Sequence, residues 1–241
     1  MSLTKLTEDV RETLVTNAHH QLFEDDGING LKYLRDRNIN EETIKDWKLG
    51  YCPDFVRDLI FNDKIIIPYY DQYGKLLAVS ARKITEEKPY WWNESFEKGE
   101  HLFGLHLAKK QIFEKNLAVI VEGQFDAISL HQSGIKIAVG LCGSAFTKKQ
   151  LIVLSRYCNR IVIASDSDEN KAGQITGQKI FDFLKNRNFH IYRWFFPNGY
   201  DPDLYVRRFG KDKCLDDLKK IIEKYSRKSS DFGNKYHYGE D

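Results

Sequence analysis

The stretches LAVIVEGQFD (residues 117–126) and RIVIASDSD (residues 160–168) decide the fold of this chain. Each begins with a short apolar run rich in β-branched residues, which is typical of a buried strand. Each run ends on acidic side chains: Glu122 follows the first, and Asp166 and Asp168 follow the second. If the chain stays extended after the second run, its period of two points both aspartates to the same side.

The sequence between these two runs alternates between helix and strand patterns. We predict a helix over residues 126–132 that stops at Gly134, and a short strand over residues 136–139. Thr147 opens the next helix, and Gln150 at its third position completes a capping box. Strands that alternate with helices at this spacing predict a parallel sheet.

Parallel sheets place functional residues just beyond the carboxyl ends of their strands, so Glu122, Asp166 and Asp168 are expected to converge. For one such residue alone, a solvated turn is the favoured interpretation. Carboxylates gathered without basic partners repel one another, and a hard cation such as Mg²⁺ is the usual resolution. The set as a whole therefore favours a metal site.

Four motifs resemble the TOPRIM domain of bacterial DnaG-type primases: EGQFD (122–126), GLCGS (140–144), DSD (166–168) and PNGYDPD (197–203). The resemblance implies a helix over residues 169–186 and a divalent ion, Mg²⁺ or Mn²⁺, bound at the acidic set. By the same resemblance, the catalytic and metal-binding residues are Glu122, Asp166 and Asp168, with Asp126, Asp201 and Asp203 in or near the metal site.

Length and composition predict a folded globular protein: 241 residues, 41% hydrophobic and 13% aromatic. The net charge of +2 gives no general nucleic-acid signal, so any basic surface must be local. The four cysteines, at positions 52, 142, 158 and 214, have neither zinc-ligand spacing nor a disulfide pattern. We therefore predict a reducing cytoplasm and no zinc; no apolar run suits a membrane.

The N-terminal part reads as small helices followed by a hairpin. Residues 6–23 carry an amphipathic helical stripe, Asn29 is expected to cap a second helix through residue 34, and Asn40 a third. Residues 65–70 and 76–80 form the hairpin, with a four-residue loop at residues 71–74.

This N-terminal part, through YLRDRNI (33–39), LGYCP (49–53), the hairpin, PYWWN (89–93) and FEKGEHLFGL (96–105), resembles the RNA polymerase domain of the same primases. Asn38 stands where the family usually has glycine, and asparagine tolerates the left-handed backbone. The resemblance implies that nucleotide and template are bound by Arg82, Asn93 and Lys98, with Arg37 a weaker candidate.

Tyr90 stands where the family usually has lysine, and Trp91 and Trp92 follow it. This aromatic run could stack on a base or fill the interface between the two halves of the chain. Both interpretations stay open from the sequence.

The remaining sequence predicts a strand over residues 189–196, a turn that contains Asp201 and Asp203, and an amphipathic helix over residues 211–225. The predicted fold class is mixed α/β. An N-terminal α+β subdomain covers residues 1–112, a Rossmann-like TOPRIM subdomain covers residues 113–226, and residues 227–241 form a disordered tail.

The resemblance implies a primase: a nucleotidyltransferase that makes short RNA primers on single-stranded DNA from ribonucleoside triphosphates. Glu122 could bind metal or act as the general base. Relative to full-length relatives the chain lacks a zinc ribbon and most of the helicase-binding part, so a zinc-ribbon protein and a replicative helicase are expected in trans. A phage or mobile element could encode such a minimal form.

Two other functions would use the same scaffold. A TOPRIM nuclease or RNA-processing enzyme would need the same acidic set to hydrolyse phosphodiesters. A non-catalytic TOPRIM scaffold for DNA repair would not need this acidic set.

Overall fold

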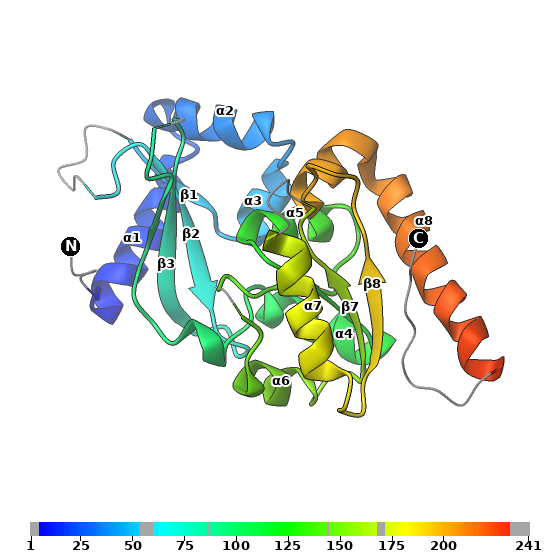
Figure 1. The fold of residues 1–241 in the computed structure, drawn as a ribbon. Coiled ribbons are helices and arrows are strands. Elements are labelled where there is room, and N and C mark those ends of the chain that lie inside the picture. The colour runs from blue at the N-terminus through cyan, green and yellow to red at the C-terminus, as the bar shows by residue number, and fades with distance from the viewer. Residues whose placement is uncertain (1–4, 54–59, 86, 144, 168–171, 232–241) are drawn as a thin grey trace. The chain divides into compact units, whose positions relative to one another are not determined.

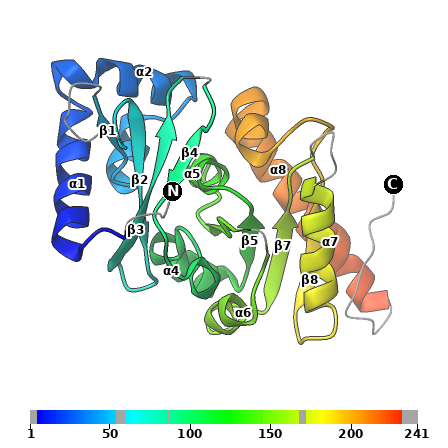
Figure 2. The same cartoon turned by 60° about the vertical axis from the view of Figure 1, so that its left-hand side comes forward.

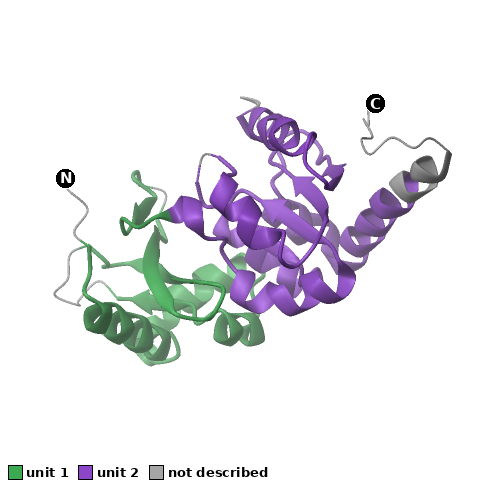
Figure 3. Cartoon of the chain, turned by 90° about the horizontal axis from the view of Figure 1, so that it is seen from below, with its two compact units in different colours: residues 1–97 green, residues 98–241 purple. Residues whose placement is uncertain are grey.

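A computed structural model describes residues 5–53, 60–85, 87–143, 145–167 and 172–231, with the side chains of residues 225–231 left out. The chain divides into two compact units, Met1–Glu97 and Lys98–Asp241, coloured green and purple in Figure 3.

The first unit packs three helices and a 3₁₀ turn with an antiparallel sheet of order β1-β2-β3-β4 (Figures 1 and 2). The elements are α1 (Glu8–Gln21), η1 (Asp25–Gly27), α2 (Ile28–Asp36), α3 (Glu41–Asp46), β1 (Gly50–Cys52), β2 (Lys64–Tyr70), β3 (Leu76–Lys83) and β4 (Trp91–Asn93). Val15 and Ala18 of α1 pack with Ile66, Val79 and Ala81 of the sheet, so this helix covers one face. One hydrophobic cluster of the unit lies there.

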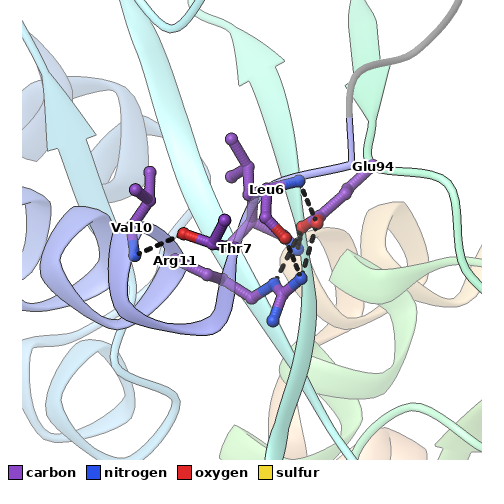
Figure 4. A network of polar contacts seen from close by, with 6 residues as sticks. Leu6, Thr7, Val10, Arg11 and Glu94 are labelled. Carbon is purple, nitrogen blue, oxygen red and sulfur yellow. Dashed lines mark hydrogen bonds and ion pairs between the residues drawn. The ribbon is translucent and has the colours of Figure 1, made fainter.

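A buried ion pair fastens the beginning of α1 to the segment that leaves β4 (Figure 4). The guanidinium of Arg11 donates to both carboxylate oxygens of Glu94, at 2.7 and 3.0 Å. Glu94, which is 1% exposed, also accepts the backbone N–H groups of Leu6 and Val79. Its charge is therefore fully partnered inside the unit, as a buried carboxylate requires.

Most of the predicted elements of this unit are confirmed. The side chain of Asn40 accepts a hydrogen bond from the N–H of Thr43 and so caps α3. Asn38 has the left-handed φ of 60°. The prediction for Asn29 was wrong: α2 already begins at Ile28, so Asn29 lies inside the helix. The hairpin is confirmed, but residues 71–75 separate its strands, one more than expected.

The second unit holds a fully parallel sheet of order β6-β5-β7-β8. Its elements are η2 (Lys98–Glu100), α4 (Leu105–Lys115), β5 (Ala118–Val121), α5 (Gln124–Gln132), β6 (Ala138–Gly140), α6 (Lys148–Leu154), β7 (Arg160–Ala164), α7 (Ala172–Leu184), β8 (His190–Trp194) and α8 (Pro202–Asp231). The mixed α/β class, with a parallel sheet after an antiparallel one, is confirmed. Thr147 and Gln150 form the predicted capping box of α6.

Helices cover both faces of the parallel sheet. Arg193 of β8 donates to Gln178 of α7, whereas its neighbour Trp194 packs against Tyr205 of α8. Successive residues of a strand point to opposite faces, so α7 and α8 lie on opposite sides of β8. This burial on both faces explains why β5 is apolar throughout and why β7 is apolar after Arg160.

Helix α8 begins at Pro202, well before the predicted start at residue 211. The earlier part was missed because Gly210 interrupts the helix with φ 78° and ψ 176°, a conformation that is essentially restricted to glycine. Helix α8 also runs past residue 226 to Asp231, while the rest of the predicted tail, residues 232–241, lies outside the described residues.

The predicted boundary between residues 112 and 113 falls inside α4, later in the chain than the division between the two compact units. As a boundary between folding domains it stays a prediction. Among the described helices, none combines the length and apolar character needed to cross a membrane.

Candidate active site at the carboxyl edge of the parallel sheet

The carboxyl ends of β5 and β7 bring two of the predicted catalytic residues together. Glu122 is the first residue after β5, and Asp166 follows β7 by two positions. The N–H of Asp166 donates to Oε1 of Glu122 at 3.3 Å, so the two strand ends are joined through this carboxylate. Both side chains are half-buried and stand at the edge where α/β sheets bind ligands.

Two glycines of α7 allow this helix to approach the end of β7 closely. A Cβ on Gly173 would lie 2.3 Å from the carbonyl oxygen of Asp166, and one on Gly177 would lie 2.4 Å from Oγ of Ser165. The glycines are four residues apart and therefore share one helix face. A larger residue at either position would displace the segment that carries Asp166.

Asp126 links the beginnings of two helices. Its Oδ2 accepts the N–H of Gly123 at 2.9 Å, which closes the first turn of α5, and its Oδ1 accepts the N–H of Asp203 at 3.1 Å, in the first turn of α8. A Cβ on Gly123 would lie 2.8 Å from Oδ2 of Asp126, so the glycine leaves room for this bond. Both oxygens of Asp126 already have donors, and its predicted role as a direct metal ligand stays a prediction.

Asp201 and Asp203 also belong to the beginning of α8 rather than to a free turn. Oδ1 of Asp201 accepts the N–H of Leu204 at 2.6 Å, as an N-cap residue does. Asp203 lies inside the helix, is 2% exposed, accepts a bond from Oγ of Ser129 at 2.5 Å and pairs with Arg207 at 3.3 Å. The prediction that Asp203 lies in a turn was wrong, because α8 starts one residue before it.

The electrostatics of this edge are those of crowded carboxylates. Burial raises the pKa of Asp126 well above its usual range, and the nearby negative charges of Asp166, Asp201 and Asp203 raise it further. The bond from the N–H of Asp203 acts in the opposite direction because it favours the charged form. Five of the six predicted acidic residues therefore gather at one end of the unit.

This donor set suits a hard divalent cation in its chemistry, because carboxylate oxygens are the ligands that Mg²⁺ and Mn²⁺ prefer. Within residues 5–53, 60–85, 87–143, 145–167 and 172–231, no three His, Cys, Asp or Glu side chains form a group that could hold a metal ion. Asp168, the third predicted ligand, lies outside the described residues, as does the predicted beginning of the helix at 169–171. Glu122 and Asp166 are the described residues that would hold an ion together with it.

Lys98 lies in the same unit as the acidic edge, at the beginning of η2. Burial lowers the pKa of its ammonium, while the sulfur of Cys142 nearby partly offsets this shift. Cys142 follows β6, and its N–H donates to the carbonyl oxygen of Glu122 at 2.9 Å. These contacts place Lys98 close to the loop beside Glu122, where a cation could meet a phosphate group.

Sequence reasoning missed the residues that hold Lys98 and α8 in position. Nε2 of Gln150 donates to the carbonyl oxygens of Lys98 and His101, at 3.2 and 2.7 Å, in addition to its role in the capping box. Ser129 and Arg207 bind Asp203. Their spacing in the sequence carries no signal, since each contact joins two elements.

The other predicted nucleotide-binding residues lie in the first unit. Nη1 of Arg82 donates to the carbonyl oxygens of Lys83 and Tyr90, and its guanidinium lies 4.7 Å from the centre of the Tyr90 ring. Asn93 accepts a bond from Oγ of Ser80 at 2.8 Å, opposite it in the sheet. Arg37 donates to the hydroxyl of Tyr33 at 3.1 Å. Their roles toward a nucleotide stay predictions.

The aromatic run divides between structural roles. Trp92 packs against the core of the first unit, with its ring 4.8 Å from that of Phe61 in an edge-to-face contact. Tyr90 and Trp91 instead lie against the guanidinium of Arg82. Trp92 therefore packs on the core of its own unit as a half-buried residue, and base stacking stays open for its two neighbours.

Comparison with known proteins points to one family. A family model described as Toprim-like matches residues 119–206. The DNA primase of Clostridium acetobutylicum is 34% identical over 217 residues, which cover 76% of this chain and 36% of that protein. The DNA primase of Aquifex aeolicus is 28% identical over 246 residues, with 88% and 47% covered. By sequence, the chain matches the catalytic core of DnaG-type primases.

Solved structures agree with this match at the level of the fold. The primase-like chain superposes on a DNA primase domain from Pseudomonas aeruginosa with a TM-score of 0.79 at 22% identity, covering 89% of this chain and 78% of that one. A DnaG primase catalytic domain bound to ssDNA gives 0.77 at 22% identity, with 88% and 80% covered. The chain spans about a third to a half of the length of the two curated relatives.

Proposed function

We propose that the chain is a catalytic core that makes short RNA primers on single-stranded DNA. The observation that carries this proposal is the meeting of Glu122 and Asp166 at adjacent strand ends, in a chain whose match to DNA primases extends over both units. A relative of the same fold binds single-stranded DNA, which supports the choice of template.

The residues have separate tasks in the proposed reaction. Glu122, Asp166 and Asp168 bind Mg²⁺ or Mn²⁺, and Glu122 alternatively takes the proton from the attacking 3′-hydroxyl. A bound divalent ion supplies charge neutralisation at the leaving pyrophosphate and lowers the pKa of that hydroxyl. Lys98 binds a phosphate group of the incoming ribonucleoside triphosphate. Asp126 acts indirectly, by holding the beginnings of α5 and α8 in register.

The predicted partners follow from the same proposal. Arg82, Asn93 and Arg37 bind nucleotide or template, and a replicative helicase and a zinc-ribbon protein act in trans. A nuclease or a DNA-repair scaffold is less well supported. The curated relatives are primases, and their match includes the first unit, which a shared TOPRIM site alone would not require.

The test is synthesis of RNA from single-stranded DNA and four rNTPs with Mg²⁺ or Mn²⁺. The wild type should give short RNA, and Glu122→Gln should lower the rate by orders of magnitude with an unchanged circular dichroism spectrum. Glu114→Gln, which makes the same substitution on the exposed surface of α4, is the matched control. Shortened DNA or RNA without new primers would contradict the proposal in favour of a nuclease.

A further inference from the structure

The amino ends of the four parallel strands meet at the edge of the sheet opposite the acidic one. Helices α4, α5, α6 and α7 each lead into one of these strands, so all four end at this edge. Figure 1 shows the connection from α7 to β8 and the connection from β8 to α8 at opposite ends of the sheet. Strand β7 is five residues long, so about 16 Å of sheet separates the two edges.

The connections that lead into the strands are basic. They are residues 116–117, 133–137, 155–159 and 185–189. Together they contain no Asp or Glu, and the cations in them or directly beside them are Lys115, Lys136, Arg156, Arg160, Lys185 and Arg187. Glu114, next to Lys115 in the chain, pairs with Lys110 at 4.0 Å. The sheet is therefore acidic at one edge and basic at the other.

The register of the sheet places these connections in one row. Ala118 of β5 pairs with Ile161 of β7, and Arg160 of β7 pairs with His190 of β8, while β6 lies on the other side of β5. Neighbouring strands lie about 4.8 Å apart, so the four strand beginnings extend over about 14 Å. One strand of duplex DNA carries a phosphate roughly every 3.4 Å along the axis, which gives about four phosphates over that length.

Two guanidinium groups of this edge are held in place by contacts that involve no carboxylate. Nε and Nη2 of Arg160 donate to the carbonyl oxygens of Asn116 and Lys115, at 3.0 and 2.6 Å. The guanidinium of Arg187 lies 3.9 Å from the centre of the Phe183 ring. A guanidinium that is already oriented loses less freedom when it binds, and its planar fork matches a phosphate group.

Three further cations at this edge are exposed: Lys115, Lys136 and Arg156. None of the three forms an ion pair with a carboxylate in the part of the chain that the structure describes, whereas Lys185 is paired with Asp182 at 2.7 Å. Cations often stabilise the end of a helix, but this effect falls off within the last turn. Arg156 follows α6 by two positions and Lys136 follows α5 by four, so helix ends do not account for them.

The connections offer little to a protein partner. Their large apolar side chains are buried beneath the edge: Leu117, Ile135, Ile137 and Phe189. A protein interface is normally built around a desolvated apolar core, which these connections do not supply. A row of cations without such a core fits a phosphate backbone, which is contacted through its charge and not through its bases.

We propose that this basic edge, formed by Lys115, Lys136, Arg156, Arg160 and Arg187, binds the phosphodiester backbone of DNA without reading its sequence. The acidic edge lies a strand length away, so the two edges can contact different parts of one DNA molecule. The part that this contact plays in priming rests on the proposed function, whereas the binding itself does not. Single-stranded and duplex DNA carry the same phosphates, and the experiment separates them.

Fluorescence anisotropy with labelled dT₂₀ and a labelled 20-bp duplex, in EDTA and across a range of NaCl concentrations, tests the proposal. Lys115→Gln/Lys136→Gln/Arg156→Gln removes three exposed charges and leaves Arg160 and Arg187 in place. The affinity of this edge variant for at least one of the two DNAs should fall about tenfold or more. The slope of log affinity against log salt should become shallower by about 2 to 3, because three phosphate contacts are lost.

Two further variants control for charge and for folding. Lys32→Gln/Lys179→Gln/Lys220→Gln removes the same net charge from exposed positions on α2, α7 and α8 and should bind DNA more tightly than the edge variant. Lys115→Arg/Lys136→Arg/Arg156→Lys keeps the charge of the edge and should bind as the wild type does.

The outcomes separate this inference from the proposed function. A loss of affinity in the edge variant that exceeds the loss in the charge control supports the basic edge, whether or not the chain makes primers. The DNA that loses more affinity, dT₂₀ or the duplex, is the one that the edge holds. Equal affinities and salt slopes for the edge variant and the charge control would overturn the proposal even if primers are made. Tighter binding of poly-glutamate than of either DNA, lost in the edge variant, would also overturn it and assign the edge to an acidic protein segment.

Discussion

At the scale of single residues, the candidate site depends on groups whose charge is costly in their surroundings. Asp126 is buried among other carboxylates, and Lys98 is half-buried beside a thiol. The shifts run in opposite directions, because burial disfavours the charged form of each group. The charged form of each residue therefore lowers the stability of the folded state. The role of each residue can be tested by measuring stability as well as activity.

The stability of the metal-free protein should fall as the pH rises from about 4 toward the raised pKa of Asp126. In that window the folded state holds a proton that the unfolded state has released, so the slope of unfolding free energy with pH is negative. Asp166→Asn removes a charge that raises this pKa and should make the fall shallower. Urea unfolding in EDTA across pH measures it. Asp182→Asn, on the exposed face of α7, is the control, and equal slopes for wild type and Asp166→Asn would contradict the prediction.

Lys98→Met should leave the melting temperature unchanged or slightly higher, because the variant no longer buries an ammonium. Primer synthesis should nevertheless fall about tenfold or more, since a charge-assisted phosphate contact is lost. Lys148→Met on the exposed surface of α6 serves as the comparison. Full activity of Lys98→Met at rNTP concentrations below KM would remove Lys98 from the nucleotide site.

At the scale of elements, the sequence was informative wherever a pattern is local. The apolar runs of β5 and β7, the capping box at Thr147 and the cap at Asn40 were predictable because each depends on neighbours in the chain. The bridge from Asp126 to Asp203 joins residues 77 positions apart, and no local pattern reports it. The beginning of α8 was missed because Gly210 reads as a helix end, although the chain is helical on both of its sides.

The ion pair of Arg11 and Glu94 fastens helix α1 to the exit of β4, and its loss should be costly. Arg11→Met leaves a buried carboxylate without its cation and should cost about 3 to 5 kcal/mol of unfolding free energy. In a Glu94→Gln background the same change should cost much less, because no charge is left behind. Urea unfolding of the four proteins of this cycle gives the coupling. Additive costs would show that the pair contributes no specific stabilisation.

At the scale of the whole molecule, folding and metal binding should be linked through the acidic edge. A ligand that binds only the folded state, at a hundred times its dissociation constant, adds about 2.7 kcal/mol. For a chain of this length, that should raise the melting temperature by several degrees. Thermal melts with EDTA and then with rising Mg²⁺ or Mn²⁺ provide the measurement.

Two carboxylate variants sharpen this test. Asp166→Asn and Asp168→Asn should each melt no lower than the wild type in EDTA, because repulsion is relieved, and should respond less to the metal. If the wild type shows no metal-dependent shift and both variants melt lower in EDTA, the carboxylates are structural and the metal-dependent proposal fails.

Gly210 interrupts α8 and divides it into two helical parts. The part before it is held to α5 by the bonds of Asp126 and Ser129 to Asp203, whereas the part after it carries the ion pairs of Lys213 with Asp217 and of Lys220 with Asp216. A Cβ at Gly210 would meet nothing within 4 Å, so only its backbone angle resists replacement. Rotation about this one residue would move the second part of α8 while the acidic edge stayed fixed, so a change of position there need not disturb the chemistry.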